Sequence, residues 1–208
     1  QTIHGKQQMK FELFKADGSS AGEIEFENFP VLEGEKGLDA LRQTVIASRA
    51  NRRQGNASTK LRSEVAGSGK KIFRQKGLGV GRAGDKKAIQ RRGGGVIFGP
   101  RPRSYNQKIN KKIKRLAFQR ALFDQANSSS ISLITEWKAT EAKTKPFKSL
   151  ISSIVSNSRK VLIIGNSFTQ EVELSARNLP NIILSTTDNL AVLDLVQADK
   201  IIVSEEGM

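Results

Sequence analysis

Hydrophobic and polar positions change their periodicity twice along the chain. Residues 9–15 and 23–28 alternate around a stretch of turn residues, which predicts a strand, a turn and a second strand. Over residues 37–54 the apolar positions recur at spacings of three and four, which predicts an amphipathic helix. The end of that helix carries Arg49, Arg52 and Arg53, and cations at a helix C-terminus are favoured by the helix dipole.

The periodicity stops between residues 55 and 105, a stretch called the basic segment from here on. It holds 11 of the 18 glycines and 13 lysines and arginines, and its hydrophobic residues are scattered. Glycine-rich cationic chain buries too little apolar surface to offset the entropy lost on ordering. We therefore expect that the basic segment does not fold on its own. Irregular connections of this length are usually functional or disordered.

Regular patterns return at residue 110. Asn110 is placed to cap a helix that runs to about residue 125 with Arg120 among its outward cations. Strands then alternate with helices, and the last helix, at 189–198, is expected to follow Asp188 as its cap. The strands are expected at 131–137, 160–165, 181–186 and 200–205, and the intervening helices from about 145 and at 169–178.

This alternation predicts the fold class. It is typical of α/β proteins with a mostly parallel sheet flanked by helices, here a Rossmann-like three-layer domain. We expect its core to come mainly from residues 108–208 together with the helix at 37–54. Residues 1–54 and 106–208 would then form a single globular domain, into which residues 55–105 are inserted as a long extended loop.

Charge is concentrated in the middle of the chain. The whole sequence has 35 Lys and Arg against 20 Asp and Glu. Residues 42–120 contain 23 of those cations and only two acids, Glu64 and Asp85, while both flanks are mildly acidic. So many like charges repel one another unless a polyanion neutralises them. The pattern therefore indicates a nucleic-acid partner.

Composition excludes several classes of protein. The absence of cysteine excludes a disulfide scaffold, a Cys/His zinc site and a cysteine nucleophile, and His4 is the single histidine. The longest apolar run, residues 161–164, is too short to span a bilayer, and residues 1–9 are too polar for a signal peptide. We expect a cytoplasmic protein without membrane association, metal, cofactor or catalytic residues.

Three glycine-containing stretches resemble nucleotide-binding motifs only weakly. IIGNSFT (163–169) has one glycine where a dinucleotide fingerprint has three. GSGKK (67–71) lacks the Ser or Thr of a phosphate loop, and GLGVG (77–81) is not flanked by a strand and a helix. A nucleotide-dependent α/β enzyme, with a pocket around Asn166 and Ser167, is therefore the less favoured alternative.

The basic segment itself has the chemistry of an RNA-binding loop. Arginine binds phosphates and stacks on bases, and glycine lets the backbone approach phosphate closely. Phe73, Phe98 and Tyr105 have rings that either stack on unpaired bases or pack locally. The expected RNA-binding residues are Arg49, Arg52, Arg53, Lys60, Arg62, Lys70, Lys71, Arg74, Gln75, Lys76, Arg82, Lys86, Lys87, Arg91, Arg92, Arg101, Arg103, Lys111 and Lys112. The expected close-approach glycines are Gly67, Gly69, Gly77, Gly79, Gly81, Gly93, Gly94 and Gly95.

Long stretches of the chain closely resemble the universal ribosomal protein L-four family of the large subunit, in its bacterial form. The resemblance is carried by RSEVAGSGKKIFRQKGLGVGRAG (62–84), RRGGGVIFGPRPRSY (91–105), NKKIKRLAFQRAL (110–122), SARNLPNI (175–182) and KIIVSEE (200–206). It implies a structural, non-enzymatic constituent of the large ribosomal subunit that binds large-subunit rRNA and supports early subunit assembly. A free-standing RNA- or DNA-binding regulator is the main alternative.

The resemblance also implies partners and a role for the end of the basic segment. Its tip would line the nascent-peptide exit tunnel, so that the partners are rRNA, neighbouring ribosomal proteins and the nascent polypeptide. The tip residues are Arg74, Gln75, Lys76, Gly77, Leu78, Gly79, Val80, Gly81 and Arg82. The chain departs from the family pattern at Ile72-Phe73, where Pro-Trp is frequent, at the tip, which lacks a hydroxyl and one cation, and at Asp85, an added acid.

Overall fold

The computed structural model describes residues 6–138, 142–155 and 158–207, so His4 lies outside the described residues. Contacts within the chain divide it into two compact units, Gln1–Ser48 with Lys108–Met208, and Arg49–Gln107. The first unit contains a sheet and its helices. In the second, residues 52–107 contain no helix or strand.

The elements follow one another as a hairpin, two helices and then alternating strands and helices. They are β1 (Lys6–Phe14), β2 (Ser20–Pro30), α1 (Leu38–Asn51), α2 (Lys111–Asn127), β3 (Ile131–Ile134), α3 (Thr144–Ile154), β4 (Val161–Gly165), α4 (Gln170–Ala176), β5 (Ile182–Thr186), α5 (Val192–Gln197) and β6 (Lys200–Ser204), with short 3-10 turns at Thr187–Asn189 and Glu205–Gly207.

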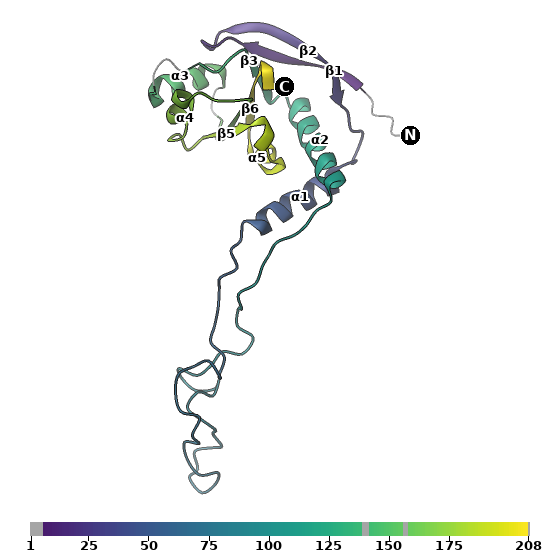
Figure 1. The fold of residues 1–208 in the computed structure, drawn as a ribbon. Helices are drawn as coiled ribbons and strands as arrows, with labels where there is room; N and C mark the ends of the chain where they lie inside the picture. The colour runs from purple at the N-terminus through teal and green to yellow at the C-terminus, as the bar shows by residue number, and fades with distance from the viewer. Residues whose placement is uncertain (1–5, 139–141, 156–157, 208) are drawn as a thin grey trace. The chain divides into compact units, whose positions relative to one another are not determined.

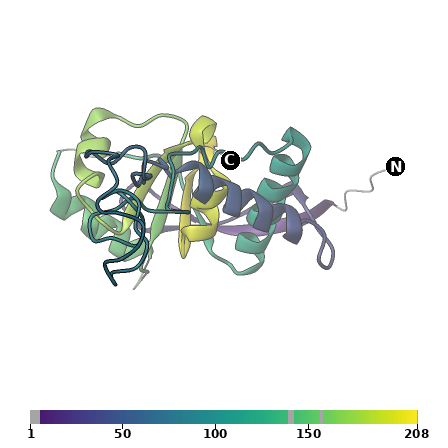
Figure 2. The same ribbon diagram turned by 90° about the horizontal axis from the view of Figure 1, so that it is seen from below.

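The six strands of the described residues form one sheet in the order β2-β1-β3-β6-β4-β5. β1 and β2 are antiparallel, whereas the neighbours β1–β3, β3–β6, β6–β4 and β4–β5 are parallel. The purple hairpin and the green strands lie toward opposite ends of this sheet (Figure 2). The predicted α/β class is confirmed, with a mixed sheet.

Successive residues of the central strands are buried on opposite faces of the sheet. Leu133 packs in one hydrophobic cluster with side chains from α2 and α5. The next residue, Ile134, packs in a second cluster with side chains from α3 and α4. Because side chains alternate between the faces of a strand, these clusters show that helices cover both faces of the sheet (Figure 1).

The N-terminal hairpin also contributes to the core, although most of the buried cluster residues come from 108–208, as predicted. β1 pairs in parallel with β3, and Phe11 and Phe29 are buried in the same cluster as Leu133. The rings of Phe11 and Phe29 lie 5.6 Å apart in a tilted arrangement. This pairing joins residues more than a hundred positions apart, so local patterns do not indicate it.

The helix at 110–125 is confirmed as α2, but two of its side chains differ from the prediction. Asn110 occupies the N-cap position without a capping hydrogen bond from its side chain. Arg120, expected to point outward, has a side chain that is only 12% exposed. Its guanidinium pairs with Asp124 and donates to the carbonyl oxygen of Gly34 at 2.6 Å. The unforeseen role of Arg120 is therefore to bind the loop before α1.

The start of the last helix is also corrected. Asp188 lies in a 3-10 turn, Thr187–Asn189, and α5 begins only at Val192 with Ala191 at its N-cap position. The apolar residues Leu193 and Leu195 are buried as the helical pattern predicts. Of the described helices, none is long and apolar enough to cross a membrane.

Candidate nucleic-acid interface

Within the second unit, the two arms of the basic segment run side by side in opposite directions. Backbone hydrogen bonds connect them from the amide of Arg103 to the carbonyl of Gly55 (3.2 Å), Thr59 to Pro100 (3.0 Å), Val96 to Lys60 (2.9 Å) and Ile72 to Gly84 (3.2 Å). These bonds are too irregular for a strand ladder, but they give the segment an internal arrangement. The expectation that the segment does not fold on its own stays a prediction.

The base of the segment is held by side chains from both arms. The Asn51 side chain accepts a hydrogen bond from the Gln107 amide at 2.7 Å and donates one to the Gln107 carbonyl at 3.3 Å. Nearby, the guanidinium carbons of Arg53 and Arg103 lie 3.7 and 4.5 Å from the centre of the Tyr105 ring. A hydrogen bond from Arg103 lowers the pKa of the Tyr105 phenol. Tyr105 therefore packs locally against two cations.

Asp85, one of the two acids of the cationic tract, has a cation as its partner. Asp85 is buried, and its Oδ2 accepts hydrogen bonds from Arg62 Nε at 3.3 Å and Nη2 at 3.1 Å. Its Oδ1 is also buried and has no hydrogen-bond partner among the described residues. Arg62 is thus committed to a contact within the protein, although more than half of its side chain stays exposed.

The second acid of the cationic tract behaves similarly. Glu64 accepts hydrogen bonds from Arg101 Nη1 and from the Leu61 amide, both at 2.8 Å. The Arg101 hydrogen bond, followed by that of Leu61, lowers the pKa of the Glu64 carboxyl. Glu64 and Arg101 come from opposite arms, so their ion pair also holds the arms together.

At two of the glycines expected to lie close to phosphate, the close neighbour is the protein's own backbone. A Cβ at Gly94 would lie 2.0 Å from the Ala88 carbonyl oxygen, and a Cβ at Gly95 would lie 2.2 Å from the Arg62 amide nitrogen. Neither position accommodates a side chain unless the backbone shifts. Gly77, Gly79 and Gly81 at the tip instead have positive φ, which glycine adopts without strain.

The structure leaves most of the expected RNA-binding side chains exposed to solvent. Lys87 and Arg91 are half-buried, and Arg91 lies 5.5 Å from the Phe73 ring. At the tip, Arg74 donates to the Gly77 carbonyl, and Lys71 contacts the Gln75 side chain. The exposed residues are Arg49, Arg52, Arg53, Lys60, Arg62, Lys70, Lys71, Arg74, Gln75, Lys76, Arg82, Lys86, Arg92, Arg101, Arg103, Lys111 and Lys112.

Unneutralised positive charge is the chemical character of the basic segment. Two of its 13 cations, Arg62 and Arg101, form ion pairs, with Asp85 and Glu64. The other eleven form no ion pair within the described part of the chain. An exposed cationic surface of this kind is suited to bind phosphates along a nucleic-acid backbone. The sequence did not reveal these two ion pairs. Because the tract has only two acids among many cations, a cationic partner for each acid was nevertheless to be expected.

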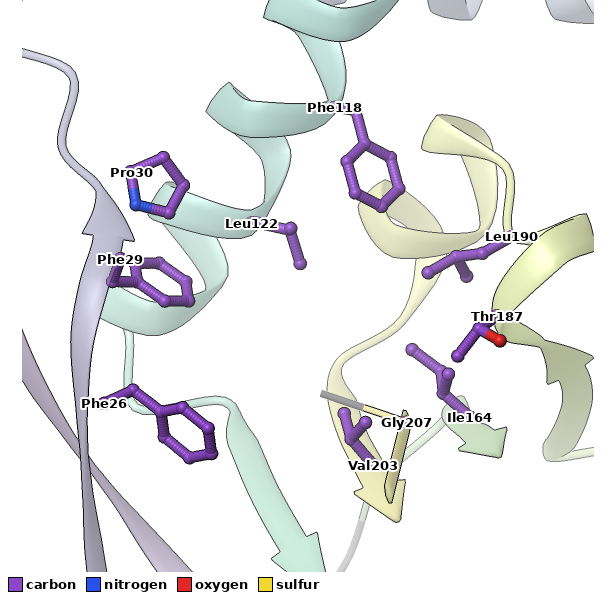
Figure 3. A pocket seen from close by; sticks show the side chains of 10 residues that line it. All are labelled: Phe26, Phe29, Pro30, Phe118, Leu122, Ile164, Thr187, Leu190, Val203 and Gly207. Carbon is purple, nitrogen blue, oxygen red and sulfur yellow. The ribbon is translucent and has the colours of Figure 1, made fainter. Parts of the chain in front are cut away.

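Two cavities of the first unit bear on the enzyme alternative. The larger, of about 440 Å³, lies between β2, α2 and the C-terminal ends of the strands. Figure 3 shows Phe26, Phe29 and Pro30 on one side and Leu190 and Val203 on the other, and none of its lining residues is titratable.

The cavity around Asn166 and Ser167 measures about 180 Å³, below the usual range of about 300–1,000 Å³ for small-molecule sites. Among the described residues no group of three or more His, Cys, Asp or Glu is placed to hold a metal ion. The larger cavity is lined mostly by apolar side chains, whereas the smaller one is lined mostly by polar side chains but is below that size range.

Comparison with known proteins agrees with the nucleic-acid-binding class that the exposed cations of the basic segment indicate. The model of the ribosomal protein L4/L1 family matches residues 30–208. The large ribosomal subunit protein uL4 of Staphylococcus haemolyticus is 39% identical over 197 residues, which cover 95% of this chain and 94% of that protein. Its counterpart in Staphylococcus carnosus is 39% identical over 195 residues, with 94% and 93% covered. This chain belongs to the ribosomal protein L4/L1 family, whose members are structural rather than enzymatic.

Proposed function

We propose that this protein is a structural constituent of the large ribosomal subunit in the cytoplasm, and that its basic segment binds large-subunit rRNA. The observation that carries the RNA-binding role is the set of eleven segment cations without an ion-pair partner among the described residues. Family membership over nearly the whole chain supports the ribosomal assignment.

The two parts of the chain have different roles in this proposal. Residues 1–54 and 106–208 form one Rossmann-like three-layer domain, and residues 55–105 form a long extended loop that penetrates the rRNA. The tip, residues 74–82, lines the nascent-peptide exit tunnel. Neighbouring ribosomal proteins and the nascent polypeptide are further partners, and the protein acts early in subunit assembly.

Phosphate neutralisation supplies the binding free energy. Each cation that meets a phosphate releases condensed counterions, so affinity falls steeply as salt concentration rises. A loop surrounded by folded RNA meets phosphates on all sides, which suits a segment whose cations come from both arms. Recognition is then by shape and backbone, because the segment contains no repeated base-reading motif.

The proposal is tested by measuring the affinity of the full chain for a large-subunit rRNA transcript between 50 and 200 mM salt, with a DNA duplex as competitor. We expect a steep loss of affinity with salt and weak competition by the duplex. A preference for short duplexes would favour the free-standing regulator. Lys145→Gln with Lys148→Gln, which removes two exposed cations of α3, is the control and is expected to leave the salt dependence unchanged.

A further inference from the structure

Phe98 is exposed over its whole surface, unlike the other two aromatic residues of the basic segment. Its side chain is 100% exposed. Phe73 and Tyr105 are half-buried. Phe73 lies near Arg91, and Tyr105 lies near Arg53 and Arg103. An aromatic ring without protein contacts loses the free energy that burial would give it. Its position therefore calls for a partner outside the chain.

The backbone is also strained at Phe98. Its φ is +55°, in the left-handed region that bulky residues rarely adopt. In the described part of the chain, Ser129 is the only other non-glycine residue with positive φ. Strain of this kind persists only where the surrounding structure imposes it, and it is concentrated at functional sites.

The neighbouring contacts show what imposes it. The Val96 amide donates to the Lys60 carbonyl, and the Thr59 amide donates to the Pro100 carbonyl. Thr59 and Lys60 are consecutive in one arm, but their partners in the other arm are four positions apart. Residues 97–99 therefore bulge out between the two hydrogen bonds. At Gly99 an added Cβ would lie 2.1 Å from Thr59 Oγ1, so the bulge is closely packed on its inner side.

Within this bulge, adjacent side chains have different surroundings. Ile97 lines a hollow of about 600 Å³ together with Leu61, Ala88 and Ile89. Phe98 does not line it and is presented to solvent. The bulge therefore places Ile97, which is 48% exposed, along the hollow and holds the fully exposed Phe98 ring away from it.

We propose that Phe98 stacks on an unpaired base of large-subunit rRNA. This inference rests on the proposed function and assigns one residue of it to base stacking. The exposed cation Lys60, which forms no ion pair among the described residues, contributes one of the carbonyls that frame the bulge, and such charge favours a polyanion over an apolar pocket of a protein. Aromatic rings stack on any unpaired base without reading its sequence, and a ring already held outward loses little freedom on binding.

The test compares Phe98→Leu with Phe98→Trp in the full chain, using a large-subunit rRNA transcript at fixed salt. Leucine keeps an apolar side chain but lacks a ring, so we expect affinity to fall about 5- to 100-fold with an unchanged salt dependence. Phe98→Trp is expected to bind within about twofold of the unchanged protein, because a larger ring stacks at least as well. Val196→Ala, at a site on α5 that is 43% exposed and aliphatic, is the control and should bind as the unchanged protein does.

The results separate this inference from the function on which it rests. If the unchanged protein binds the transcript with steep salt dependence while Phe98→Leu binds equally well, stacking is wrong and the rRNA role stands. If Phe98→Leu binds the transcript normally but is lost from assembled subunits, the partner is a protein and the inference is also wrong. If the unchanged protein does not bind the transcript, both fail.

Fluorescence of Phe98→Trp gives a second readout that does not depend on affinity. The native Trp137 is buried, so its emission serves as an internal reference. We expect the introduced indole to be accessible to acrylamide in the free protein and protected once the transcript binds. Continued accessibility in the saturated complex would contradict stacking.

Discussion

Arg62 Nη2 lies 3.1 Å from Asp85 Oδ2, and this ion pair joins two positions of the basic segment that are 23 residues apart in sequence. The carboxylate is buried while the guanidinium is largely exposed. One expected phosphate ligand, Arg62, is therefore held by an acid of the basic segment itself.

Removing the charge of Asp85 should release Arg62 to bind phosphate. We expect Asp85→Asn to steepen the salt dependence of rRNA binding by about 0.7–0.9 in the logarithmic slope, the contribution of one cation. The measurement is affinity against salt concentration for the unchanged protein and the variant. An unchanged slope would show that Arg62 stays beside residue 85, or already contacts phosphate, in the complex.

The pair between Glu64 and Arg101 makes the contact between the arms dependent on pH. Because the folded-state pKa of Glu64 is lowered, its stabilising effect is present above the unfolded value of about 4.3 and is lost as pH falls through the folded value. We expect Arg101→Gln to shift the pKa of Glu64 upward, measured by NMR titration of the side-chain carboxyl carbon. Arg103→Gln is the control, and an equal shift in both variants would contradict the assignment.

Each cation at the tip should add a measurable increment to the salt dependence of rRNA binding. Arg74 and Lys76 are exposed and make no ion pair within the described residues. Replacing both by alanine should weaken rRNA binding and make the logarithmic salt slope shallower by about 1.4–1.8. A loss of affinity without a change of slope would mean that the two side chains do not contact phosphate.

The stability of the first unit should depend on the strands that are buried on both faces. Leu133 has no exposed surface, so Leu133→Ala should lower the free energy of unfolding by about 2–5 kcal/mol. Val196→Ala, at a site that is 43% exposed, should change it by less than about 0.5 kcal/mol. Urea denaturation followed by far-UV circular dichroism measures both, and similar losses for the two variants would contradict the arrangement of the core.

Local patterns predicted most elements of the fold because each depends on residues close in sequence. The helix at 110–125 follows from apolar periodicity, and the strand at 160–165 follows from a short continuous apolar run between two helical patterns. The role of Arg120 was missed because it binds the carbonyl of Gly34, which is 86 positions away. The parallel pairing of the N-terminal hairpin with β3 was missed for the same reason.

For the candidate interface, the sequence indicated which residues carry charge but not how they are arranged. The exposed cations follow from composition, since two acids cannot neutralise so many bases. The contrast between Phe98 and Tyr105 does not, because one ring is exposed by a strained bulge and the other is covered by two arginines. Both features depend on pairing between the arms, which no periodicity encodes.

The central claim is that the basic segment attaches this protein to large-subunit rRNA, and fractionation of a cell lysate tests it most directly. On a sucrose gradient at moderate salt, the unchanged protein is expected to sediment with large ribosomal subunits. Migration of the unchanged protein at the top of the gradient, under conditions in which the subunits stay intact, would contradict the claim.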